Sequence, residues 1–171
     1  TQGNKLNTSD IKRVQPPIET LTARDLGRLI KAVTGDHWTD KRNVVMIAVM
    51  ARAGLRVGEV VGLDVEDVTL RERSGWLKVR GKGRKERRAP LSNAARKALE
   101  DYLALRPASD DRALFLSRDQ RSRLTSRAVQ HMVSRAAQVA GLERRVTPHL
   151  LRHTVASRYL EAGGTLAELR D

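Results

Sequence analysis

Residues 53–91 read AGLRVGEVVGLDVEDVTLRERSGWLKVRGKGRKERRAPL, and within this stretch the spacing of the apolar residues changes from helical to strand-like. An apolar helix ends at Gly54, and a short helical turn follows from Val57 to Leu63. Beyond it, short apolar groups are separated by Ser74–Gly75 and by the segment 81–83, which is typical of strands joined by turns. The stretch therefore predicts a small three-stranded antiparallel sheet that carries a glycine-rich, basic hairpin.

The sequence on both sides of this stretch has helical spacing, with start and stop signals for each helix. Thr22 and Asp25 form a capping box, and Thr147 followed by Pro148 is a strong helix start. A further capping box begins at Thr165. We therefore predict an α+β fold that is mainly α-helical, with helices over residues 23–33, 40–53, 93–106, 126–140, 148–162 and from 166 onward.

The chain is strongly basic, and its positive charge is concentrated in two segments. It has 171 residues, with 33 Lys or Arg, 20 Asp or Glu and a net charge of +13. Residues 71–88 hold nine Lys or Arg against two acids, and residues 112–158 hold ten Arg against two acids. Such segments favour a polyanionic partner, most often nucleic acid. An RNA-binding protein or an anionic membrane surface also fits the charge, although five aromatic residues offer few platforms for stacking single-stranded bases.

Other classes of protein are disfavoured by what the sequence lacks. The longest apolar run, Val44 to Ala51, is far shorter than the roughly 20 residues of a membrane span. The first 20 residues are polar and do not resemble a secretory signal. Because Cys is absent, disulfides, thiolate nucleophiles and Cys-based zinc sites are excluded. We therefore expect a cytoplasmic protein with no membrane partner.

The segment 147–153 has the pattern of an anion site. Offsets of three and four residues place His149, Arg152 and His153 on one helix face, where all three can donate hydrogen bonds to an anionic oxygen. A solvated polar face is the alternative. Zinc fits the two histidines less well, because the Glu of an HExxH motif is missing and Arg152 repels a cation. We therefore predict no metal site.

Two further basic motifs are candidates for binding an anion. Arg56 lies between two glycines, and Glu59 follows at a distance that suits an ion pair, either at the surface or holding the guanidinium in a fixed orientation. The loop 81–83 lacks the spacing of a Walker loop, but its glycines allow a close approach to a phosphate. Its Lys82 is either a contact to backbone phosphates or a proton donor to a leaving oxygen.

Taken together, three motifs resemble those of one known family. They are AGLRVGEVVGLDVEDV (53–68), VRGKGRKERRAPL (79–91) and TPHLLRHTVASRYLEAGG (147–164). In this order and at these separations they resemble the catalytic domain of the tyrosine recombinases, or phage integrases, and most of all the Xer-type and bacterial-integrase branch. The resemblance covers residues 18–171. It implies site-specific recombination or integration of double-stranded DNA by strand cleavage and rejoining, through a 3′-phosphotyrosyl intermediate and without a cofactor.

The resemblance also implies roles for individual residues. Arg56 and Arg152 would clamp the oxygens of the scissile phosphate, where such donors stabilise the charge of the transition state. Lys82 would protonate the 5′-hydroxyl leaving group, and His149 would share in proton transfer or phosphate binding. Glu59 would support Arg56. His153 would orient the side chains that contact the phosphate, and contacts to DNA are expected from Arg80, Arg84, Lys85, Arg87 and Arg127.

The nucleophilic tyrosine of the family lies further beyond the second arginine than this chain extends, because only 19 residues follow Arg152. Tyr159 belongs to the same predicted helix as Arg152 and Tyr102 to another, so both are interpreted as partly buried helix residues. We expect a catalytic domain (18–171) without its C-terminal segment, which binds DNA but does not cleave it. Residues 1–17 would be the linker from a missing N-terminal DNA-binding domain.

The resemblance leaves two expectations on assembly and one alternative function. The full-length protein would form a homo-tetramer on DNA, whereas these 171 residues alone would be monomeric. The alternative is a non-catalytic DNA-binding regulator or module that uses the same fold.

Overall fold

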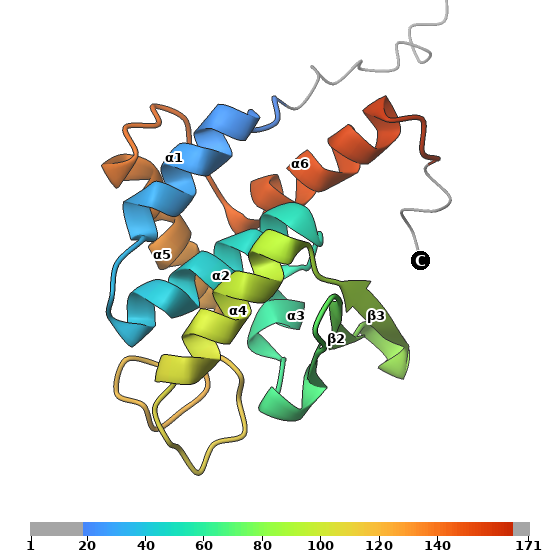
Figure 1. The fold of residues 1–171 in the computed structure, drawn as a ribbon. Coiled ribbons are helices and arrows are strands. Elements are labelled where there is room, and N and C mark those ends of the chain that lie inside the picture. The colour runs from blue at the N-terminus through green and yellow to red at the C-terminus, as the bar shows by residue number, and fades with distance from the viewer. Residues whose placement is uncertain (1–18, 166–171) are drawn as a thin grey trace, which may run out of the picture.

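Helix α2 lies at the centre of the fold, and the computed structural model describes residues 19–165 around it (Figure 1). The apolar run from Val45 to Ala51 is buried, because α2 packs against α1, α4 and α6. In chain order the elements are α1 (Ala23–Val33), α2 (Trp38–Arg52), α3 (Val57–Val61), η2 (Val65–Asp67), β1 (Val68–Leu70), β2 (Gly75–Arg80), η3 (Lys82–Arg84), β3 (Glu86–Pro90), α4 (Asn93–Leu105), α5 (Ser126–Val139) and α6 (Pro148–Glu161).

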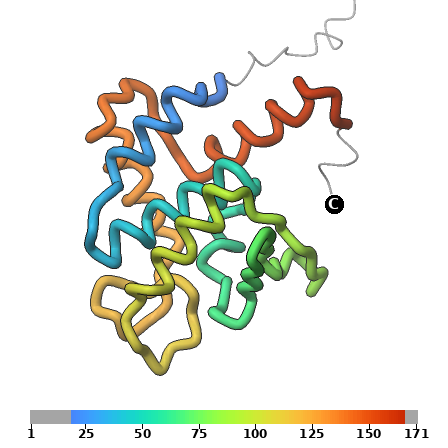
Figure 2. Tube along the Cα trace, viewed as in Figure 1, coloured from blue at the N-terminus to red at the C-terminus, as the bar shows by residue number. Residues whose placement is uncertain are grey.

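The arrangement confirms the mainly helical α+β fold with one small sheet. Helices α1 and α5 lie together on one side of α2, and the sheet lies at the other side of the molecule (Figures 1 and 2). The helix expected from residue 166 onward lies outside the described residues. No helix among residues 19–165 is long and apolar enough to cross a membrane.

The helix starts follow the capping residues of the sequence. Thr22 and Asp25 make both bonds of their capping box, and the Thr147 side chain accepts the N–H of Leu150 ahead of α6. Helix α2 begins at Trp38, two residues before the predicted start. The predicted start was wrong because Asp40 is the third residue of the helix. Its carboxylate accepts a hydrogen bond from the N–H of His37, and the ring of His37 caps the helix.

The sheet is antiparallel in the order β1–β2–β3, as the sequence predicted. Leu77 and Val79 of β2 are buried beside Ala89 of β3. Val65, which was expected in the first strand, instead lies in the 3-10 turn η2. At the hairpin tip Gly83 has a φ of 75°, a left-handed conformation that glycine adopts without strain.

The segment between α4 and α5 has no helix or strand of its own, yet residues 113–116 are fully buried. Arginine side chains hold it in place through its carbonyl groups. Arg42 of α2 donates to the carbonyl of Leu116 at 2.6 Å, and Arg106 donates to that of Ala113 at 2.6 Å. The buried backbone is thus paired, as a buried loop requires.

Candidate active site

Three arginines from separate elements converge on one carboxylate, that of Glu59. The Oε2 atom of Glu59 lies 3.0 Å from Nη2 of Arg87 and 3.9 Å from Nη1 of Arg152, and Oε1 lies 3.4 Å from Nη1 of Arg56. The Glu59 side chain is 7% exposed, whereas Arg56 is 64% exposed. These four residues form what we call the Glu59 cluster. It brings together Arg56, Glu59 and Arg152.

The local backbone fixes the positions of these side chains. Helix α3 begins directly after Arg56, whose N–H donates to Oε2 of Glu59 at 2.9 Å, so the carboxylate also serves as the cap of its own helix. Gly54, with a φ of 70°, ends α2 and turns its carbonyl toward α6. There it accepts a hydrogen bond of 3.1 Å from Nη1 of Arg152. The short turn between α2 and α3 thus carries Arg56 and also binds Arg152 of α6 through the carbonyl of Gly54, so both arginines lie near one carboxylate.

The Glu59 cluster carries a net charge of +2, since three guanidiniums face one carboxylate. Burial lowers the pKa of Arg152, and the charges of Arg56 and Arg87 lower it further while Glu59 opposes them. The cluster is therefore short of negative charge. Each guanidinium has five N–H donors but makes a single side-chain hydrogen bond within residues 19–165. An anion with several oxygens, such as a phosphate diester, fits these remaining donors.

The two histidines of α6 lie beside this cluster on the same helix as Arg152. The rings of His149 and His153 are stacked with their centroids 6.0 Å apart, so the two side chains lie on one helix face. His149 is exposed and lines a pocket of about 540 Å³. No group of three or more His, Asp or Glu side chains in the described part of the chain could hold a metal ion.

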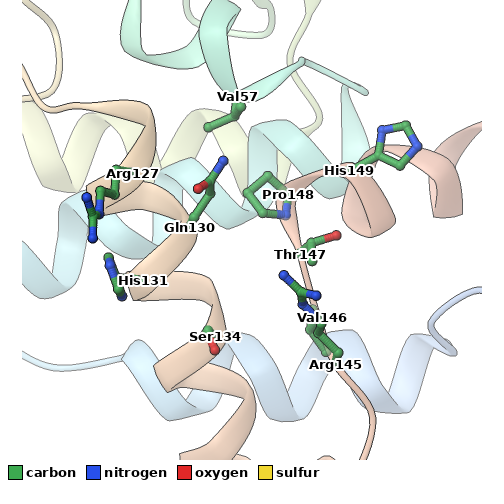
Figure 3. A pocket seen from close by; sticks show the side chains of 10 residues that line it. All are labelled: Val57, Arg127, Gln130, His131, Ser134, Arg145, Val146, Thr147, Pro148 and His149. Atoms are coloured by element: carbon green, nitrogen blue, oxygen red, sulfur yellow. The ribbon is translucent and has the colours of Figure 1, made fainter.

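The pocket lies between α5 and the segment that leads into α6 (Figure 3). Its polar lining from α5 is Arg127, Gln130, His131 and Ser134, and Arg145, Thr147 and His149 line the other side. Val57, the residue after Arg56, also lines it, so the pocket adjoins the start of α3. The predicted DNA contact Arg127 is exposed in this basic hollow.

Some of the predicted hairpin residues are exposed, and others form ion pairs with buried carboxylates. Lys82 is exposed in η3, and Arg84 and Lys85 are exposed beside it. Arg87, in the returning strand β3, belongs to the Glu59 cluster, whereas Arg80, in β2, pairs with Asp67 through two hydrogen bonds of 2.8 Å.

The two tyrosines differ from one another in burial. Tyr102 is fully buried, its hydroxyl donates to the carbonyl of Leu114 at 2.8 Å, and burial raises its pKa. Tyr159 is 39% exposed, more than we expected, and its ring lies against the backbone of Gly164.

Sequence reasoning placed Arg87 among the DNA contacts and did not connect it with Glu59. Strand alternation contained the signal, because Arg87 lies two residues before the buried Ala89 and so on the same face of the strand. The acidic residues Asp64 and Asp67, both buried, were not singled out at all. Their burial arises from packing of η2 against the sheet and the loop before α5, which no local pattern indicates.

Comparisons with known proteins agree with this fold. The profile of the Phage integrase family matches residues 19–171. The tyrosine recombinase XerC of Pseudomonas aeruginosa is 40% identical over 154 residues, which cover 89% of this chain and 50% of the relative. The crystal structure of XerA recombinase superposes with a TM-score of 0.76 at 36% identity, over 86% of this chain and 52% of that one.

A further solved structure has the same fold at lower identity. It is the XerH site-specific recombinase bound to its difH substrate in a pre-cleavage complex, with a TM-score of 0.71 and 24% identity over 84% of this chain and 43% of that one. The chain spans about half the length of the curated relatives that it matches. From the family profile and the XerC relatives we conclude that this chain belongs to the phage integrase family of tyrosine recombinases.

Proposed function

We propose that the chain is the catalytic part of a site-specific recombinase that cuts and rejoins double-stranded DNA through a 3′-phosphotyrosyl intermediate. The observation that carries the proposal is the Glu59 cluster, where Arg56, Arg87 and Arg152 keep donors available for an anion. Guanidiniums bind phosphate oxygens through paired hydrogen bonds, and a preorganised set of donors stabilises the charge that develops at phosphorus.

In the proposed reaction each group has one task. A tyrosine outside residues 19–165 gives up its phenolic proton, to His149 or to water, and its oxygen attacks phosphorus, and the bond to the 5′-oxygen breaks as the phosphate becomes esterified to the tyrosine. Arg56 and Arg152 hold the non-bridging oxygens, and His149 shares in proton transfer or phosphate binding. Lys82 gives a proton to the leaving 5′-oxygen. Rejoining is the reverse, with the 5′-hydroxyl as nucleophile.

Duplex DNA as the partner is supported by the basic pocket beside the cluster, which is lined by Arg127, His131 and Arg145. The related XerH fold was solved bound to its difH substrate. We propose that residues 18–171 are one domain preceded by a linker, and that these residues alone bind DNA as a monomer without cleaving it. A longer protein that contains them would assemble as a tetramer on DNA in the cytoplasm.

The test uses what we call the completed recombinase, in which this whole chain is joined to the segments that XerC of Pseudomonas aeruginosa has outside the matched region. The substrate is a nicked duplex with the recombination site of that relative, which traps the covalent complex. Arg152→Ala should lower covalent-complex formation by a factor of about 100 to 1,000, because one charge-stabilising donor is lost. DNA binding should remain within about threefold, since one phosphate contact among several is removed.

The matched control is Arg158→Ala, which removes an exposed arginine from the same helix. It should form the covalent complex at the parent rate. Robust complex formation by Arg152→Ala would contradict the proposed mechanism. DNA binding by the parent without any covalent complex would favour the non-catalytic DNA-binding module instead.

A further inference from the structure

The hairpin that carries Lys82 is anchored at its base by a buried carboxylate. Arg80, the last residue of β2, donates from Nη1 and Nη2 to the two oxygens of Asp67, both at 2.8 Å. The Asp67 side chain is fully buried, with 0% exposure. A bidentate pair of this kind fixes the orientation of the guanidinium as well as its position.

Asp67 is itself held rigidly. Its Oδ2 accepts the N–H of Asp64 at 2.9 Å, which closes the turn η2. Nζ of Lys78, two residues before Arg80 on the same strand, lies 3.7 Å from Oδ1. Glu59 and Asp67 line one small pocket of about 40 Å³ together with Lys78 and Arg80, so the anchor adjoins the Glu59 cluster.

Beyond Arg80 the hairpin has few further contacts: Glu86 pairs with Arg80 across the strands, and its Oε1 lies 3.8 Å from Nε of Arg80. The N–H of Gly81 donates to the carbonyl of Lys85 at 2.8 Å, and this bond closes the loop. Lys82, Arg84 and Lys85 are exposed, and their like charges repel one another. The direction in which Lys82 points is therefore set by the strand ends, through Arg80 on one strand and Arg87 on the other.

We propose that Asp67 and Arg80 are positioning residues, which direct Lys82 toward a phosphate held by Arg56 and Arg152. This inference rests on the proposed function, in which Lys82 is the general acid. It assigns Arg80 a role different from the DNA contact that the sequence suggested, because its guanidinium is committed to Asp67. A proton donor displaced by about 1 Å loses about a hundredfold in rate, so an anchor of this kind matters to catalysis.

The test depends on the leaving group. When sulfur replaces the bridging 5′-oxygen at the scissile position, the leaving group is a thiolate, whose conjugate thiol has a pKa of about 8.5, so it departs without a general acid. An alkoxide needs the proton. A variant that acts through Lys82 is therefore slow on the oxygen substrate and restored on the sulfur substrate, whereas a variant with general damage is slow on both.

Four variants of the completed recombinase are compared on both substrates. Asp67→Asn keeps the shape of the buried side chain but removes its charge, and Arg80→Gln removes the guanidinium from a residue that is 39% exposed. Lys82→Ala removes the proposed acid, and Lys78→Gln is the matched control, because it takes a cation from the same carboxylate without releasing the hairpin base. Single-turnover cleavage rates and DNA affinity are measured for each.

Asp67→Asn and Arg80→Gln should cleave the oxygen substrate about 10 to 100 times more slowly and the sulfur substrate within about threefold of the parent, with unchanged DNA affinity. Lys78→Gln should behave as the parent on both. If Lys82→Ala is restored by sulfur and the Asp67 and Arg80 variants are not, the positioning role is wrong and the proposed function stands. If sulfur does not restore Lys82→Ala, Lys82 is not the general acid and the proposed function fails at that step.

A second measurement needs no cleavage and uses the 171-residue chain itself. Backbone ¹⁵N relaxation gives the order parameters of Gly81 and Gly83 at the hairpin. We expect them to fall from about 0.85, the value of a rigid backbone, to below about 0.6 in Arg80→Gln. Unchanged order parameters in Arg80→Gln and Asp67→Asn would overturn the anchor.

Discussion

Two regions of this molecule gather arginines around buried carboxylates, and they do so in opposite ways. In the Glu59 cluster each of three guanidiniums makes one side-chain hydrogen bond within the described residues. In the second region, which we call the acid pair, Asp64 and Asp67 pair with two arginines, Arg80 and Arg123, that each make more than one hydrogen bond inside the protein. Arg80 makes two hydrogen bonds to Asp67, and Arg123 makes three, to Asp64 and to the carbonyls of Val61 and Leu63.

This difference in hydrogen bonding distinguishes arginines that can bind an anion from arginines that stabilise the fold. An arginine whose donors are used inside the protein joins segments that are distant in sequence, as Arg123 joins the loop before α5 to the end of α3. An arginine whose donors remain available can exchange water for an incoming anion. We therefore expect loss of Asp64, which ties Arg123 to the fold, to change stability, and substitutions of the arginines in the Glu59 cluster to change phosphate binding and activity.

The largest expected effect on stability comes from Asp64, which is 4% exposed. Asp64→Ala leaves Arg123 and Arg112 without their shared carboxylate, and we expect the free energy of unfolding to fall by about 2–3 kcal/mol. Arg56→Ala in the Glu59 cluster should change it by less than about 0.5 kcal/mol, because that side chain is 64% exposed. Urea unfolding of the chain measures both.

If Arg56→Ala destabilised the chain as much as Asp64→Ala does, the Glu59 cluster would also stabilise the fold. The two regions would then not differ in function. The slope of the unfolding free energy against urea should be the same for both variants, since neither changes the surface that unfolding exposes.

A smaller effect is expected at Tyr102, whose hydroxyl holds the loop that the acid pair also fixes. Tyr102→Phe should lower the free energy of unfolding by about 1 kcal/mol, the typical value of one buried hydrogen bond. Tyr159→Phe, at an exposed position, should change it by less than about 0.5 kcal/mol. If the free energy of unfolding fell equally in both variants, burial of the tyrosine would not explain the loss of stability.

The pH dependence of stability offers a check on the same residue. Because burial raises the pKa of Tyr102, the folded state keeps its proton at a pH where the unfolded state has lost it. Tyr102 therefore contributes stability below the ordinary tyrosine pKa of about 10, and this contribution is lost as the pH rises from there toward the folded-state pKa. In Tyr102→Phe this part of the decline in stability above pH 10 should be absent.

Much of the fold was predictable because its signals are local. The capping residues Thr22, Thr125 and Thr147 each start a helix where the sequence places one, and the change in apolar spacing after Gly54 predicted the sheet. The start of α2 was missed by two residues, because Asp40 serves as the third residue of a capping box. Local patterns locate helices well but do not always fix the residue at which they begin.

The site was predictable only in part, and for a physical reason. Arg56, Glu59 and Arg152 were expected together because the motifs resemble those of a family, whereas Arg87 joins them through a contact between residues 28 positions apart. Arg80 was expected to face DNA because it lies in a basic segment. Its partner Asp67 is buried by long-range packing, which charge counting along the chain does not show.

Arginines of the Glu59 cluster are expected to bind a DNA phosphate, whereas Arg80 of the acid pair is not. The most direct measurement is the salt dependence of duplex DNA affinity for the chain with Arg56→Gln and with Arg80→Gln, which each remove one positive charge. Releasing one phosphate contact lowers the slope of log affinity against log salt by about 0.9. We expect this change for Arg56→Gln and none for Arg80→Gln, and equal changes in both variants, or a larger one for Arg80→Gln, would contradict the account.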